Sequence, residues 1–141
     1  MVFYTPTTKA QNVGRIALGI FMLTAGIGHL SFARTALQAQ VPDWVPFTKD
    51  FTVVASGYVE IALALSLLFL KRYRVIVGIV LAVFFVAIFP GNIEQYTKHK
   101  DMPGLETDTA RLIRLFFQPL LIWLALWGTG AIKAWNERKK D

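Results

Sequence analysis

The sequence predicts an all-α integral membrane protein: a four-helix bundle with both termini on the cytoplasmic side (N-in/C-in). Three observations support this prediction. First, 55% of the 141 residues are hydrophobic, which is more than a water-soluble domain of this length can bury. Second, four stretches each approach the ~20 apolar residues that cross a hydrocarbon core. Third, the basic residues cluster between these stretches, and mostly on one side.

The predicted spans fill most of the chain, so we expect a single membrane domain over residues 1–141. They cover residues 14–33, 51–70, 75–93 and 112–132. The first is longer than the apolar part of a signal peptide and is expected to be a permanent span. The connection at residues 71–74 is so short that the second and third spans should be antiparallel neighbours. We expect Asp50 to cap the second helix, and Thr107 or Asp108 to cap the fourth.

The charge distribution predicts the orientation. With four spans, the two termini and the second connection share one side, and most of the 15 lysines and arginines lie there. They are Lys9, Arg15, Lys71, Arg72, Arg74, Lys133, Arg138, Lys139 and Lys140, opposed only by Glu137 and Asp141. The other side mixes basic residues with most of the acids. The positive-inside rule then predicts a multi-pass protein of the bacterial inner membrane, with its long loops outside.

Composition also bounds the chemistry. The chain has no cysteine, which excludes disulfides, thiolate metal sites and thiol redox chemistry carried by the chain itself. His29 and Glu60 are too few ligands for a metal site, so no metal is expected. The net charge of +6 lies at the predicted membrane edges. We therefore attribute it to topology and to the lipid bilayer as partner, not to nucleic acid.

Glu60 is the residue that most needs an explanation, because it stands in the middle of the span at residues 51–70. An unpaired ionisable group at that depth costs roughly 2.5–3.5 kcal/mol on insertion scales. Arg114, on the fourth span, is the expected counter-charge, since its long side chain can reach inward. Glu60 is therefore either a carboxylate paired with Arg114 or a protonated carboxyl bonded to a neighbouring helix.

The remaining intramembrane polar residues fall in the same half of the spans, which predicts a polar pocket opening to the outer face. The candidate ligand-binding residues are His29, Ser56, Glu60, Asn92, Arg114, Gln118 and, in the first outer loop, Trp44. Glu60 and His29 are the candidates for proton transfer, although no catalytic residue is assigned. The inner half is expected to be almost purely apolar.

Structural alternatives stay open for several of these residues. Asn92 and Gln118 are equally typical of hydrogen bonds between membrane helices. His29 suits packing near a helix end, and Arg114 suits an arginine that extends to lipid phosphates. Arg111 and His99 are expected in water or at the headgroups.

Several segments together resemble the DoxX family of small bacterial four-helix membrane proteins. They are residues 26–30, Pro42 and Pro46, and residues 56–60, 86–93 and 114–123. The chain departs from the family pattern at Gly91, where many members carry alanine, and at Pro119, which follows Gln118 instead of preceding it.

The resemblance implies a quinone-interacting or redox-associated membrane subunit, belonging to a membrane oxidoreductase if the chain is part of an enzyme at all. It implies no covalently bound cofactor, a quinone as ligand and a redox partner protein. The alternative is a non-catalytic membrane scaffold that recruits a partner protein, with a purely structural polar cluster. A conductor of protons or small molecules ranks last, because the inner half offers no polar path. A homo-oligomer stays open.

Overall fold

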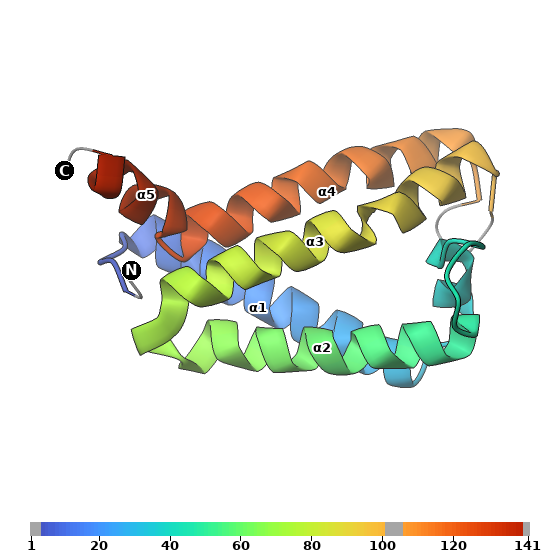
Figure 1. The fold of residues 1–141 in the computed structure, drawn as a ribbon, viewed down its shortest axis with the longest axis horizontal. Coiled ribbons are helices and arrows are strands. Elements are labelled where there is room, and N and C mark those ends of the chain that lie inside the picture. Colours follow the sequence, from blue (N-terminus) through green and yellow to red (C-terminus); the bar gives the residue numbers. More distant parts are fainter. Residues whose placement is uncertain (1–3, 101–105, 140–141) are drawn as a thin grey trace.

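The computed structural model describes residues 4–100 and 106–139, and in this part of the chain all regular secondary structure is helical, with no strand. Four long antiparallel helices form the bundle: α1 (Lys9–Leu30), α2 (Lys49–Phe69), α3 (Arg74–Thr97) and α4 (Asp108–Gly128) (Figure 1). A short helix α5 (Ala131–Lys139) follows α4. The 3-10 turns η1 (Ala36–Gln40) and η2 (Lys71–Tyr73) lie in connections. All four long helices are long and apolar enough to span a membrane, which confirms the predicted all-helical bundle of membrane-spanning elements.

The N-termini of three helices are fixed by threonine side chains. Thr8 caps α1 in a reciprocal capping box with Gln11, so this helix begins earlier than the predicted span at residues 14–33. Thr107 caps α4, as predicted. The prediction for α2 was wrong: Thr48 is the cap, and Asp50 lies within the first turn, where its negative charge favours the helix dipole.

The fourth span was predicted to reach residue 132, but α4 ends at Gly128. Gly130 has a φ of 83°, a left-handed conformation that glycine adopts without the steric cost of a Cβ atom. The chain turns at this residue, and α5 continues in another direction (Figure 1).

The bundle consists of two helix pairs, α1 with α2 and α3 with α4. Helices α2 and α3 are neighbours at η2, as the short connection predicts, and they separate towards their other ends (Figure 1). The pairs meet in an apolar core that includes Leu18, Met22, Leu67, Leu81, Phe85 and Leu121. We call the end of the bundle with η1 and the α3–α4 connection the loop end. The end with η2 and α5 is the terminal end.

Two polar residues of α1 contradict the expectation of an apolar inner half. The buried guanidinium of Arg15 donates from Nη1 to the carbonyl oxygen of Leu67 at 2.7 Å. The side-chain amide of Gln11 donates to the carbonyl oxygen of Trp127 at 2.8 Å. Both acceptors lie in the last turns of helices, where carbonyl groups lack a partner within the helix. The N-terminal part of α1 therefore supplies hydrogen bonds to the ends of α2 and α4.

The loop end is covered by the segment from η1 to Pro42, which lies directly on α3. A Cβ atom at Gly91 would overlap the carbonyl oxygen of Gln40, so this close approach requires glycine. Immediately after this segment, Asp43 forms ion pairs with three lysines, Lys49, Lys98 and Lys100. These lysines hold the pKa of Asp43 well below its usual value, and Asp43 in turn raises the pKa of Lys98.

Candidate functional site

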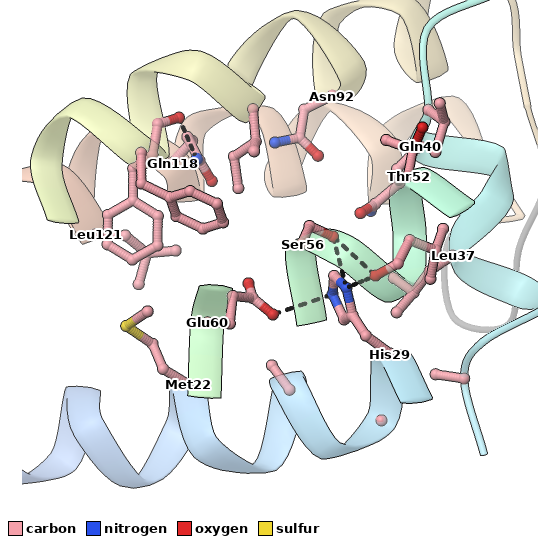
Figure 2. A pocket seen from close by; sticks show the side chains of 18 of the residues that line it. Met22, His29, Leu37, Gln40, Thr52, Ser56, Glu60, Asn92, Gln118 and Leu121 are labelled. Carbon is pink, nitrogen blue, oxygen red and sulfur yellow. Dashed lines mark hydrogen bonds and ion pairs between the residues drawn. The ribbon is translucent and has the colours of Figure 1, made fainter. Parts of the chain in front are cut away.

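A cavity of about 550 Å³ lies in the loop-end half of the bundle, between the two helix pairs and beneath the η1 segment. That volume is within the range of small-molecule sites. The structure brings six of the seven predicted site residues to its wall: His29, Ser56, Glu60, Asn92, Arg114 and Gln118. Figure 2 shows all of these except Arg114 with labels. Most of the remaining wall is apolar, with Met22, Phe84, Phe85, Ile88 and Leu121 among its residues. The cavity therefore combines an apolar surface with a few convergent polar groups.

The centre of the polar cluster is a contact between α1 and α2. The Nε2 atom of His29 lies 3.1 Å from Oε2 of Glu60, and Glu60 is only 7% exposed. This oxygen has no hydrogen-bond partner in the described structure. The contact is thus close and polar, and a proton on Glu60 or on Nε2 of His29 would prevent repulsion of their lone pairs.

Two glycines bring His29 onto α2. A Cβ atom at Gly57 would lie 2.6 Å from Cβ of His29, and one at Gly26 would lie 2.7 Å from Ile61. Their small size lets the helix backbones approach closely, as is common at membrane helix crossings. On its other side, Nδ1 of His29 lies 3.1 Å from the Val53 carbonyl oxygen and 3.0 Å from Oγ of Ser56. Hydrogen-bonding groups of α2 therefore hold the imidazole at Nδ1, and its Nε2 atom faces Glu60.

The direct ion pair predicted between Glu60 and Arg114 is not formed. Arg114 instead donates from Nη1 to Oε1 of Gln118 at 3.2 Å, one turn along α4. The amide of Gln118 donates in turn to the Phe85 carbonyl oxygen at 2.6 Å, which joins α4 to α3. His29 is the partner of Glu60 because the glycine crossing places α1, and not α4, against this face of α2. Arg114 and Glu60 share the cavity and interact only by longer-range attraction.

Asn92 shows a different arrangement from that of Gln118. Its side chain projects from α3 into the cavity (Figure 2), and the residue is only 4% exposed. Within the described residues, its amide makes no hydrogen bond of the helix-to-helix kind that the structural alternative requires. Its amide atoms are not among the fully enclosed side-chain atoms that lack a partner, so they border the open volume of the cavity. The amide is thus available to a molecule in the cavity as both donor and acceptor.

Other predicted positions fall outside the cavity wall. Trp44 is 70% exposed and does not line the cavity. His99 is exposed and contacts Asp108. Arg111, expected in water or at headgroups, is instead buried, with Nη2 at 3.3 Å from Asp108.

Sequence reasoning missed three polar residues of the wall: Thr24, Gln40 and Thr52. The hydroxyl of Thr24 donates to the Ile20 carbonyl oxygen within α1. Gln40 comes from η1, and its amide donates to Oε1 of the buried Gln95 at 3.2 Å. Gln40 and Thr52 lie near the loop end, where polar side chains are ordinary. Nothing in their spacing marks them as part of the site.

The cavity reaches the surface of the bundle along α1. Phe21 and Phe32 belong to its wall, and both are exposed, at 50% and 78%. Phe21 also contacts the ring of Phe117 edge-on, which connects α1 to α4 on the terminal side of the opening. Phe21 belongs to α1, a helix long and apolar enough to span a membrane, and Phe32 lies just beyond the end of α1.

Comparison with known proteins gives one result at the level of the family. Neither the curated proteins nor the solved structures contain a significant match to the chain. A family model does match residues 18–129, a range that contains every residue of the cavity wall. The chain therefore belongs to the family described as Domain of unknown function (DUF8561).

Proposed function

We propose that this protein binds a quinone in the loop-end cavity, as the membrane subunit of an oxidoreductase system. The observation that carries the proposal is the combination of an apolar cavity with a buried, unpartnered amide at Asn92. Quinone carbonyls are acceptors and need donors, which Asn92 and the free N–H groups of Arg114 supply. The apolar wall suits a flat ring, and the opening along α1 suits a ligand that dissolves in lipid.

The His29–Glu60 contact gives this site a source of protons. A bound quinone takes up two electrons and two protons when it is reduced to a quinol. His29 and Glu60 can transfer the proton that they share to one quinone oxygen, and the same pair, once water at the loop end has reprotonated it, can supply the second proton to the other oxygen. The chain contributes no electron carrier in this proposal. The electrons come from a partner protein that carries a flavin, haem or iron–sulfur centre.

The proposal includes an orientation with both termini in the cytoplasm of a bacterium and the loop end outside. The ion pairs of the structure support it. At the loop end, Arg34 is paired with Asp50, and the lysines around Asp43 are paired with that carboxylate. At the terminal end, Lys9, Lys71, Arg72 and Lys133 have no carboxylate partner among the described residues. The unneutralised positive charge is therefore concentrated at the terminal end, as the positive-inside rule requires of a cytoplasmic face. The resemblance to DoxX proteins supports the same arrangement.

Titration of the purified protein in lipid nanodiscs with a short-chain ubiquinone tests the proposal. We expect saturable binding by the wild type and weaker binding by Arg114→Ala, which removes donors from the wall. Glu60→Gln should change affinity less, because Gln retains a polar group at this position. Equal binding by all three proteins, or none, would support the scaffold alternative, in which the cluster only fixes helix packing.

A further inference from the structure

We propose that the cavity is selective for an anionic amphiphile, whose ionised oxygens face Arg114 and Asn92 and whose apolar body lies against the aromatic and aliphatic wall. This inference rests on the proposed function, which makes the cavity a ligand site. It adds the charge of the preferred ligand.

Three residues of the wall can carry charge: His29 from α1, Glu60 from α2 and Arg114 from α4. The wall residues contributed by α3 and by the η1 segment are uncharged, Asn92 and Gln40 being the polar ones. The net charge of the cavity is thus set by the protonation of His29 and Glu60, added to the permanent charge of the guanidinium.

The hydrogen-bond network assigns the protons of His29. Its Nδ1 atom lies 3.1 Å from the Val53 carbonyl oxygen, which can only accept, so Nδ1 must carry a hydrogen. Oγ of Ser56 donates to the same carbonyl and can accept from Nδ1. With Nδ1 protonated, Nε2 has either a lone pair or a second proton.

At 3.1 Å, the lone pairs of Nε2 and of Oε2 of Glu60 would repel each other unless one of the two groups carries a proton, so we assign one proton to the pair. If the proton belongs to Glu60, both side chains are neutral. If it belongs to His29, an imidazolium faces a carboxylate. In both cases the pair has a net charge of zero, so it does not neutralise Arg114.

Arg114 therefore leaves the cavity with an uncompensated positive charge. Its one hydrogen-bond partner in the described structure is the neutral amide of Gln118, and this bond uses Nη1. The other N–H groups of the guanidinium remain available, and their fork suits two oxygens of an anion. A lone charge in a low-dielectric site is costly, and an anionic ligand removes that cost. Asn92 adds a neutral donor nearby on the wall.

The test compares a charged ligand with a neutral one of nearly equal shape. Lawsone, a hydroxynaphthoquinone that is ionised at neutral pH, is titrated against the wild type in nanodiscs, and so is its methyl ether, which has no ionisable group. We expect lawsone to bind at least about tenfold more tightly than the ether. Arg114→Gln should reduce this ratio to about one, and Arg114→Lys, which keeps the charge, should retain part of it. Arg72→Gln, at an exposed arginine of the terminal end, is the matched control and should leave the ratio unchanged.

A second pair of probes, dodecanoate and dodecanol, identifies the source of the anion. If lawsone and its ether bind equally, the quinone site stands and the charge selectivity is overturned. If only dodecanoate binds, and its binding depends on Arg114, the anion selectivity stands with a fatty-acid carboxylate as its source, and the quinone function falls. If no probe binds, both proposals fall.

Discussion

The Nε2 atom of His29 and the Oε2 atom of Glu60 lie 3.1 Å apart, and they come from two helices that cross at a pair of glycines. This contact joins the packing of the bundle to the chemistry of the cavity. A change at the crossing alters the site, and a change at the site alters how the two helices hold each other.

Replacement of Glu60 should show how much this contact stabilises the fold. In Glu60→Gln, the amide can still donate to Nε2 of His29, so we expect the free energy of unfolding to change by less than about 1 kcal/mol. Glu60→Leu removes the partner of Nε2 and should destabilise the protein by roughly 1–3 kcal/mol. Equilibrium unfolding in micelles with increasing dodecyl sulfate measures both values. A Leu variant as stable as the wild type would mean that the contact contributes nothing to stability.

Gly57→Ala should open the α1–α2 crossing. The new Cβ atom would meet Cβ of His29 at 2.6 Å, and neither atom can move without its helix. We expect a loss of about 1–3 kcal/mol of unfolding free energy. Gly28→Ala is the control, because its Cβ would come closest to the ring of the exposed Phe32, which can rotate away, and would meet Cβ of Ala33 only at the ordinary contact distance of 3.6 Å. That control should be neutral or slightly stabilised, since alanine favours a helix. Equal losses in both variants would contradict the close crossing.

The Asp43 cluster should make stability depend on acidity. Because Lys49, Lys98 and Lys100 hold the pKa of Asp43 well below its unfolded value, its contribution is complete above about pH 4 and is lost as the pH falls further. The Asp43→Asn variant lacks this contribution at every pH. We expect its melting temperature to lie below that of the wild type near neutral pH, and the two to converge in strong acid. If the melting temperatures of the two proteins ran parallel over the whole acid range, Asp43 would not be the cause of the pH dependence.

Single-cysteine labelling should report the orientation, because the natural chain has no cysteine to interfere. Trp44 at the loop end and Asn136 on α5 are both exposed in the structure. In intact bacterial cells, a membrane-impermeant maleimide should label Trp44→Cys and leave Asn136→Cys unlabelled until the cells are lysed. The reverse pattern would overturn the proposed placement of the termini.

The helices and most of the polar residues of the cavity wall could be predicted from the sequence. The contacts between these polar side chains could not. Long apolar runs specify membrane helices because only a helix satisfies its own backbone in lipid. Depth along a span also placed Asn92, Arg114 and Gln118 in one half of the bundle. Depth does not say which way a side chain faces around the helix. The predicted pairing of Glu60 with Arg114 was therefore wrong, because the partner of Glu60 depends on the crossing at Gly57.

Two further differences have the same origin in contacts that are distant along the chain. Arg15 was assigned to the membrane edge by its charge, yet it is buried against Leu67, whose free carbonyl exists only because α2 ends there. Gln40 lies in an ordinary polar loop, and only its approach to Gly91 makes it part of the cavity. Such contacts appear only once the helices are placed in space.

The exposed rings of Phe21 and Phe32 at the cavity mouth have a consequence for ligand length. A long hydrocarbon tail need not be enclosed by the protein, since it can extend past these rings and run beside the acyl chains. Affinity should then depend strongly on the head of the ligand and weakly on its tail. Compounds that share a head and differ only in the number of isoprenoid units would compete for the site on nearly equal terms.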